Sequence, residues 1–163
     1  MVQEYGRSFG IPTVCFRAGC LTGPYHAAAE LHGFLAYLAR SMREGRAYRI
    51  YGYKGKQVRD NLHAWDVCTA IQAFYENPRT AAVYNLGGGR ANGVSVLEAI
   101  ARYEDIMGRT LVVEYVDQNR AGDHICYISD LRRLRADYPQ WTVTRSLDTI
   151  LLDLAGHRRD APR

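Results

Sequence analysis

A basic, glycine-containing segment at residues 52–63 carries residue types that suit a phosphate group. Its glycines at positions 52 and 55 allow the backbone to turn tightly and to approach a ligand closely. Lys54, Lys56 and Arg59 place three cations within six residues, and phosphate oxygens accept hydrogen bonds from such cations. The segment therefore predicts an anion-binding loop that leads directly into a helix from His63. A solvent-exposed hairpin tip is the alternative, because short motifs of this kind often match by chance.

The histidines and cysteines do not indicate a metal centre. His32, His63 and His124 have no partner four residues away that would complete a metal pair, and a lone histidine is more often a hydrogen-bonded structural residue. The four cysteines are widely spaced and form no Cys-x-x-Cys pair. We therefore expect no bound metal, and reduced, mostly buried thiols in place of a disulfide framework.

Motifs of a more specific kind follow one another along the chain. They are RAGCLTGP at 17–24, QVRDNLH at 57–63 followed by Asp66, YNLGGG at 84–89, and RAGDH at 120–124 followed by SDL at 129–131. An ordered set is far more specific than one short match. In this set the chain resembles the C-terminal half of the extended short-chain dehydrogenases/reductases, the family of NAD-dependent nucleotide-sugar epimerases and dehydratases. Within the family, ELHGFL at 30–35 and GKQVRD at 55–60 resemble the CDP-paratose 2-epimerase (CDP-tyvelose epimerase) branch.

The resemblance implies an α/β fold, namely the C-terminal part of a doubly wound, Rossmann-like parallel sheet with the small substrate-binding lobe. It assigns residues 1–156 to the substrate-binding portion and 157–163 to a frayed charged tail, with the N-terminal NAD-binding half absent. In the intact architecture NAD oxidises a ring carbon of a nucleotide sugar, and hydride returns to the opposite face and inverts that centre. The implied partners are a nucleotide diphosphate-sugar, with a CDP-sugar favoured, and the N-terminal half if it is separately encoded. The family is often homo-oligomeric.

The resemblance also implies which side chains hold the nucleotide. Arg59 and Arg120 bind the pyrophosphate, and a guanidinium suits this role because it can bind two phosphate oxygens at once. Asp123 matches the ribose-binding carboxylate, with a simple turn residue after a glycine as the alternative. Tyr51 lies where relatives line the base pocket. The sequence thus supplies cations, a carboxylate and an aromatic wall.

The remaining implied ligands are Gln57 and Cys20 on the substrate, and Ala18 and Gly19 on the nicotinamide side. Cys20 stands where many relatives carry a substrate-binding asparagine, so that contact differs here. The family's catalytic equipment is a glycine-rich NAD turn and a Tyr-x-x-x-Lys pair. This sequence has neither G-x-G-x-x-G spacing nor a lysine four residues after a tyrosine.

We therefore expect no catalytic residue in this chain, no activity from the chain alone, and no tight binding of NAD. A non-catalytic nucleotide-sugar-binding module is one alternative reading. A fragment of an NAD-dependent sugar-nucleotide dehydratase is another.

Hydrophobic periodicity predicts the elements that position these residues. We expect helices over residues 2–9, 34–45, 63–77, 95–108, 130–139 and 146–156, and strands over 13–16, 48–51, 82–86 and 111–116. The strands at 13–16 and 82–86 read as buried, and the glycine run at 87–89 as a strand-to-helix turn. Ser95 and Glu98 form a capping-box pattern. Asp66 falls in the first turn of its helix, where a structural role and a ligand role are both open.

Composition limits the remaining function classes. The chain has 163 residues, 47% hydrophobic and 23% charged, which is enough for one modest domain or part of one. Its apolar runs are too short for a membrane helix and its first residues lack a signal-peptide core, so we expect a cytoplasmic protein without a membrane partner. The net charge of +4 comes mainly from scattered arginines without a nucleic-acid-binding motif. A nucleic-acid binder, the remaining alternative, would show strongly salt-dependent retention.

Overall fold

Parallel strand pairs build the two outer sheets in the computed structural model, which describes residues 1–30 and 32–156. Strand β1 (Val14–Ala18) pairs in parallel with β5 (Ala82–Leu86), and strand β3 (Tyr48–Tyr51) pairs in parallel with β7 (Val113–Val116). The expected α/β class with parallel pairing is confirmed.

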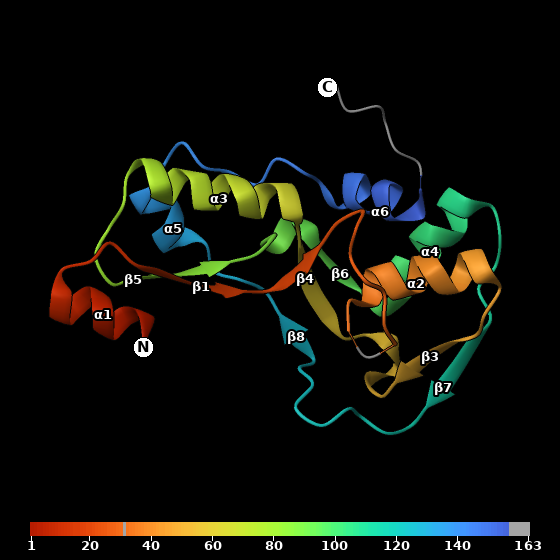
Figure 1. Cartoon of the computed structure of the whole chain (residues 1–163). Coiled ribbons are helices and arrows are strands. Elements are labelled where there is room, and N and C mark those ends of the chain that lie inside the picture. The colour runs from red at the N-terminus through yellow and green to blue at the C-terminus, as the bar shows by residue number, and fades with distance from the viewer. Residues whose placement is uncertain (31, 157–163) are drawn as a thin grey trace.

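A mixed sheet lies between these two pairs (Figure 1). Its central strand, β4 (Val58–His63), runs parallel to β2 (Cys20–Thr22) and to β8 (Cys126–Tyr127) and antiparallel to β6 (Gly93–Ser95). Strand β4 therefore connects the two sides of the molecule.

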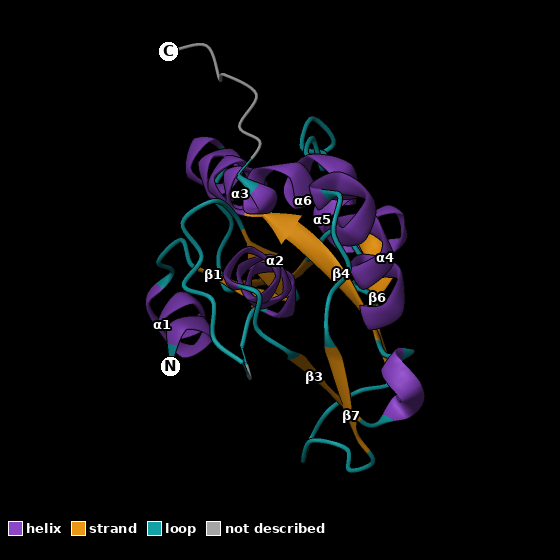
Figure 2. Cartoon of the chain, turned by 90° about the vertical axis from the view of Figure 1, so that its right-hand side faces the viewer, coloured by secondary structure: helices purple, strands orange, loops and turns teal. Residues whose placement is uncertain are grey.

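Helices cover the sheets on both sides of β4 (Figures 1 and 2). They are α1 (Val2–Phe9), α2 (Phe34–Glu44), α3 (Ala64–Glu76), α4 (Val96–Met107), α5 (Arg132–Asp137) and α6 (Leu147–Ala155), with short 3-10 turns η1 (Tyr53–Gly55) and η2 (Arg90–Asn92). In Figure 1, α1, α3 and α5 lie around β1 and β5, and α2, α4 and α6 lie together beside β3. The described helices are thus divided between the two halves of the fold.

Each half has its own hydrophobic core. One core joins α2, α4 and α6 to β3 through buried side chains that include Leu38, Tyr103 and Ile150. The other core joins β4, β5 and α5, with Leu62, Tyr84 and Trp141 among its buried residues. The indole nitrogen of Trp141 donates to Thr69 Oγ1 at 3.2 Å, so the ring packs against α3. Burial of this apolar area is the main stabilising contribution to each half.

Capping explains where several helices begin and end. At α4 the Ser95 hydroxyl accepts from the backbone of Glu98 and the Glu98 carboxylate accepts from Ser95, which confirms the capping box. Ser146 caps α6 through Thr149 in the expected way. Helix α3 begins one residue later than expected, because His63 extends β4 and then serves as the N-cap.

Asp66 in the first turn of α3 is a structural residue. Its fully buried carboxylate accepts from Thr144 N at 3.1 Å, from Thr144 Oγ1 at 2.5 Å and from Arg145 N at 3.0 Å. These bonds attach the segment before α6 to α3. The structural reading of this residue is therefore confirmed.

The basic segment differs from the expected loop. Only residues 53–55 form a turn, and residues 58–63 form strand β4. The prediction was wrong because Arg59, Asp60 and Asn61 are polar residues that are uncommon in strands, where β-branched and aromatic side chains are preferred. The burial of Asp60 and Asn61 depends on hydrogen bonds to distant parts of the chain, which periodicity does not reveal.

Other expectations need smaller corrections. Strand β1 is half-buried instead of buried, since only one of its edges is paired within the described residues. The glycine run at 87–89 leads into η2 and β6 before α4 begins. Leu131 stands at the N-cap of α5 in place of Asp130, although the Asp130 carboxylate still accepts from the Arg132 backbone at 3.0 Å.

The structure also bears on the expectations for the cysteines and for membrane-spanning helices. All four cysteines are free, but Cys68 and Cys126 are exposed, so the expectation of mostly buried thiols was wrong. No helix within residues 1–30 and 32–156 is long and apolar enough to cross a membrane. The expected tail at 157–163 lies outside the described residues.

Candidate functional site

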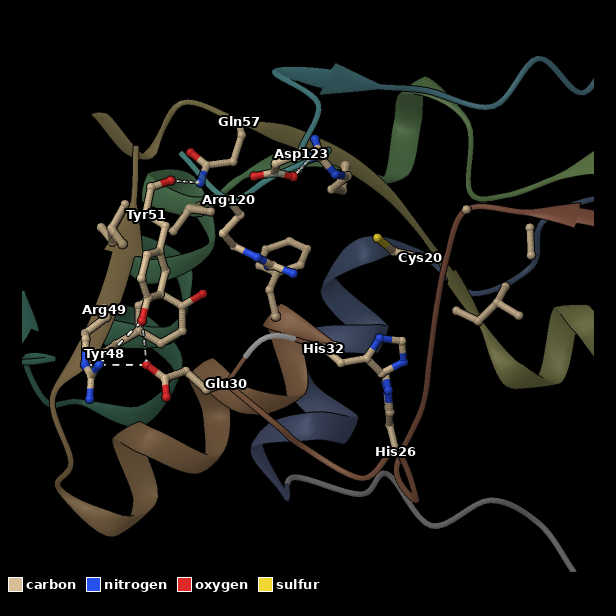
Figure 3. Close-up of a pocket in the computed structure, with 18 residues that line it drawn as sticks. Cys20, His26, Glu30, His32, Tyr48, Arg49, Tyr51, Gln57, Arg120 and Asp123 are labelled. Atoms are coloured by element: carbon tan, nitrogen blue, oxygen red, sulfur yellow. Dashed lines mark hydrogen bonds and ion pairs between the residues drawn. The ribbon is translucent and has the colours of Figure 1, made fainter. Parts of the chain in front are cut away.

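A cavity of about 420 Å³ opens between the β1–β2 junction and strand β3 (Figure 3). All the residues that the sequence analysis selected as ligands line this cavity: Ala18, Gly19, Cys20, Tyr51, Gln57, Arg59, Arg120 and Asp123. They come from segments far apart in the sequence. The fold brings them together, while their individual ligand roles stay predictions.

The junction between β1 and β2 brings Ala18, Gly19 and Cys20 to the cavity. The Gly19 backbone nitrogen donates to Leu86 O at 2.8 Å, which ends the pairing of β1 with β5. A Cβ on Gly19 would lie 2.8 Å from Asp60 Oδ1, closer than side chains pack. Glycine is therefore needed at this position for the β1–β2 junction to lie against Asp60 of β4.

Arg120 and Asp123 lie in the connection between β7 and β8, which runs beside the connection between β3 and β4. Residue Tyr51 at the end of β3 pairs with Val116 at the end of β7, and Val58 at the start of β4 pairs with Cys126 in β8. Both pairings are parallel, so the connection from β3 to β4 and the connection from β7 to β8 run side by side. The second connection carries both predicted ligands.

Gly52 allows these connections to touch. Its nitrogen donates to Val116 O at 2.9 Å, its φ is +61°, and a Cβ there would collide with Asn119. The Tyr53 hydroxyl donates to Asp123 O at 3.4 Å. The basic segment thus positions the predicted ligands.

The two lysines of the basic segment do not contribute to the site. Lys54 and Lys56 are exposed and are absent from the cavity lining, unlike Arg59. The expectation that three neighbouring cations act together is therefore wrong. The turn at Tyr53–Gly55 and the start of β4 direct these side chains to different surroundings.

Arg59 and Asp123 form an ion pair with each other, and each side chain is only 15% exposed. Arg59 Nη1 also donates to Val58 O at 2.6 Å, and Asp123 Oδ1 also accepts from His124 N at 3.1 Å. The expected phosphate ligand and the expected ribose ligand are therefore neighbours. A bound nucleotide would have to form its bonds to Arg59 and Asp123 either beside the bond between these two side chains or in place of it.

Asp60 is a buried residue of the site region that the sequence analysis did not select. Its carboxylate is fully buried, and Oδ2 accepts from Gly89 N at 2.9 Å and from Ser129 N at 3.1 Å. These bonds attach the glycine run and the segment after β8 to β4. The sequence offered no signal for this role, because the strand that places Asp60 on the face opposite Arg59 was not predicted.

An aromatic and charged group occupies one end of the cavity. The Tyr51 hydroxyl donates to Glu30 Oε1 at 3.0 Å, and Arg49 Nε lies 3.5 Å from the same oxygen. Gln57 Nε2 donates to Tyr51 O at 3.3 Å and fixes the backbone there. Burial raises the pKa of the Tyr48 phenol well above its ordinary value, while nearby Arg120 acts in the opposite direction. Tyr48 is therefore a neutral wall of the site at physiological pH.

Sequence reasoning missed Glu30, Arg49 and Tyr48 as cavity residues. The alternation in residues 48–51 indicated a strand but not which ligand the strand faces. Glu30 belonged to the motif at 30–35 that supported the resemblance, but it lies 21 residues before Tyr51 in sequence, so only the fold shows that the two side chains meet.

The opposite end of the cavity contains Cys20, His26 and His32 (Figure 3). Burial raises the pKa of the Cys20 thiol, against the opposing effect of nearby Arg59, so the thiol is protonated at neutral pH. Partial burial and then the neighbouring His32 lower the pKa of His26, whose Nδ1 lies 3.3 Å from Thr22 Oγ1. Within the described residues no group of three His, Cys, Asp or Glu side chains is arranged to hold a metal ion.

Comparison with curated proteins links the chain to sugar-nucleotide enzymes. The chain is 32% identical over 88 residues to dTDP-glucose 4,6-dehydratase 1 of Escherichia coli (strain K12), a match that covers 54% of this chain and 23% of the relative. It is 29% identical over 143 residues to dTDP-glucose 4,6-dehydratase of Xanthomonas campestris pv. campestris (strain B100), covering 83% of this chain and 39% of the relative. The chain thus spans less than half the length of these curated relatives.

Solved structures show the same fold. UDP-glucose 4-epimerase of Thermus thermophilus, in complex with NAD, superposes with a TM-score of 0.80 at 23% identity, over 97% of this chain and 50% of that chain. The dTDP-glucose 4,6-dehydratase of Bacillus anthracis str. Ames, in complex with NAD, superposes with a TM-score of 0.80 at 24% identity, over 96% of this chain and 47% of that chain. The sequence model of the family described as "NAD dependent epimerase/dehydratase family" matches residues 1–87, which is more than half of the chain. The chain therefore belongs to the NAD dependent epimerase/dehydratase family.

Proposed function

We propose that the chain is the nucleotide-sugar-binding portion of an NAD-dependent nucleotide-sugar epimerase, and that its favoured ligand is a CDP-sugar. The observation that carries this proposal is the convergence of Arg59, Arg120 and Asp123 with an aromatic wall in one cavity. The family membership and the sugar-nucleotide names of the relatives support it.

The order of side chains along the cavity suits the parts of such a ligand. Figure 3 shows Arg120 reaching into the middle of the cavity, with Tyr51 and Glu30 on one side and Cys20 on the other. In our proposal Arg59 and Arg120 bind the two phosphates, since guanidinium groups form strong bidentate bonds to phosphate oxygens. Asp123 accepts from ribose hydroxyls.

The base and the sugar then occupy opposite ends. The base packs on Tyr51 and Tyr48, because an aromatic ring offers a flat apolar face. The sugar extends toward Cys20, His26 and the β1–β2 junction. This placement uses every predicted ligand except Gln57, whose amide donates to Tyr51 O at 3.3 Å, and it leaves the base at the end that contains Glu30.

NAD fits this chain only in part. Ala18 and Gly19 form a surface at the β1–β2 junction that suits the nicotinamide side. The sequence has no glycine-rich turn for the dinucleotide phosphates and no Tyr-x-x-x-Lys pair for proton transfer. In our proposal these are supplied by an N-terminal half, in a cytoplasmic and homo-oligomeric enzyme.

Two other functions remain as alternatives. The missing Tyr-x-x-x-Lys pair favours a non-catalytic nucleotide-sugar-binding module, and the curated relatives favour the binding portion of a dehydratase. Addition of an N-terminal half from a family member separates them. An epimerised sugar supports our proposal, a 4-keto-6-deoxy product supports a dehydratase, and binding without turnover supports the module.

Calorimetric titration of CDP into the purified chain tests the binding site itself. We expect Arg120→Ala to weaken CDP binding by about tenfold to a hundredfold, the equivalent of about 1.5–3 kcal/mol for a lost charge-assisted hydrogen bond. Arg132→Ala is the matched control, because that side chain is 91% exposed and lies outside the cavity lining. Absence of CDP binding, or equal losses in the two variants, would show that the proposed site is wrong.

A further inference from the structure

The aromatic end of the cavity contains a carboxylate to which the proposed function assigns no task. Glu30 lines the cavity, and its side chain is 34% exposed. Figure 3 shows it turned toward Tyr51 and Arg49, with dashed lines to both. Its Oε1 accepts from the Tyr51 hydroxyl at 3.0 Å and lies 3.5 Å from Arg49 Nε. The carboxylate is therefore held in place beside the ring on which a base would pack.

A carboxylate in this position distinguishes bases by their hydrogen-bonding edge. An ionised carboxylate only accepts hydrogen bonds, and its two oxygens offer about four lone-pair sites. Tyr51 and Arg49 engage Oε1, so the group keeps capacity for a further N–H donor. Cytosine presents an amino group at C4, whereas uracil and thymine present a carbonyl oxygen there. Glu30 would accept from the first and repel the second.

We propose that Glu30 is a specificity-determining residue that selects cytosine over uracil and thymine. This inference rests on the proposed function, because it requires the base to pack at the Tyr51 end. Repulsion of the wrong base adds to the selection that attraction of the right base provides. Arg49 and Tyr51 act as positioning residues, since both contact the Glu30 carboxylate directly.

The test compares CDP, UDP and ADP titrations into the purified 163-residue chain and its variants. We expect CDP to bind the unmodified chain about tenfold more tightly than UDP, in line with the discrimination measured for well-placed base contacts. Glu30→Gln should reduce this ratio to about one, because an amide both donates and accepts. The ratio of CDP affinity to UDP affinity is the quantity to compare, because removal of a negative charge alone strengthens the binding of both diphosphates equally.

Glu114→Gln is the matched control. Glu114 also faces Arg49, at 3.7 Å, but its side chain is 60% exposed and it lies outside the cavity lining. We expect this variant to keep the full preference for CDP. Glu30→Ala is a second variant that removes the carboxylate, and it should also bring the ratio to about one.

The outcomes separate the two proposals. If CDP and UDP bind equally to the unmodified chain, or if both Glu30 variants keep its preference, the role of Glu30 is overturned while the nucleotide site stands. If ADP binds as tightly as CDP, the site does not select pyrimidine bases, and the role of Glu30 in base selection is overturned. If none of these nucleotides binds, the proposed function fails, and the inference fails with it.

Discussion

The Arg59–Asp123 pair allows a sharp test of where the phosphates and the ribose bind. Both CDP and inorganic pyrophosphate carry two phosphates, but only CDP carries a ribose. If Arg59 binds a phosphate, Arg59→Ala weakens both ligands. If Asp123 binds the ribose, Asp123→Ala strengthens pyrophosphate binding, because it removes a negative charge, and it lowers the affinity for CDP relative to pyrophosphate.

The expected magnitudes follow from the charges and the burial of the pair. A hydrogen bond to a charged group contributes about 1.5–3 kcal/mol, so Arg59→Ala should weaken both ligands by about tenfold to a hundredfold. A carboxylate about 6 Å from a phosphate charge opposes it by about 3 kcal/mol at an effective dielectric constant of about 20. Both side chains are 15% exposed, and salt screens part of this repulsion. We therefore expect Asp123→Ala to improve pyrophosphate binding by about tenfold.

CDP should respond differently to Asp123→Ala. It gains the same relief from repulsion but loses the ribose hydrogen bonds, which contribute a similar amount. Its affinity should change little, so the ratio of CDP to pyrophosphate affinity should fall by at least about tenfold. Calorimetric titration of both ligands into each variant measures this ratio directly.

A second Arg–Asp pair supplies the control. Arg102 and Asp148 are 2.6 Å apart on the surface, with side chains 47% and 75% exposed, and both lie outside the cavity lining. Alanine at either position should leave both ligands unaffected. If Asp123→Ala weakens pyrophosphate as much as Arg59→Ala does, Asp123 only holds Arg59 in place, and the assigned ribose role is wrong.

Two further predictions concern stability and thiol chemistry. Asp66→Ala should lower the free energy of unfolding by about 3–5 kcal/mol in a urea titration, because it leaves several buried donors unpaired. An unchanged urea midpoint with lost CDP binding would instead indicate a ligand role. Cys20 should react with iodoacetamide more slowly than exposed Cys68 at pH 8, because burial raises the pKa of the Cys20 thiol and only the thiolate reacts. Mass spectrometry of the labelled peptides measures both rates, and a Cys20 rate equal to or faster than the Cys68 rate would contradict this.

Local signals in the sequence predicted the helices well. Ser95 and Glu98 satisfy each other's backbone groups within four residues, so this helix start depends on nearby chemistry alone. Gly45 ends α2 for a similarly local reason, since its φ of +64° is a conformation that glycine adopts readily. Such features do not depend on the rest of the fold.

Strand β4 could not be predicted in the same way. Val58–His63 contains charged and amide side chains, and its stability as a strand comes from partners elsewhere in the chain. Asp60 is buried only because Gly89 and Ser129 donate to it, and the Asn61 amide donates to Asn92 O at 3.3 Å. Tertiary hydrogen bonds therefore override the local preference of these residues for a loop.

The candidate site shows the same limit. The resemblance indicated Arg59, Arg120 and Asp123 as ligands, but it did not show that Arg59 is paired with Asp123. Nor did it reveal Glu30, whose place beside Tyr51 depends on how the segment before α2 crosses the end of β3. Contacts between residues far apart in sequence require the fold, and residue types alone do not supply it.

Neighbouring cations in a sequence are therefore a weak guide to an anion site. Lys54 and Lys56 lie next to the predicted phosphate ligand in sequence, yet both are exposed outside the cavity. Arg120 lies far from Arg59 in sequence and shares the cavity with it, because the parallel pairs β3–β7 and β4–β8 align the connections between them. The glycine at position 52, not the lysines beside it, is what the basic segment contributes, since it lets the connection that carries Arg120 approach.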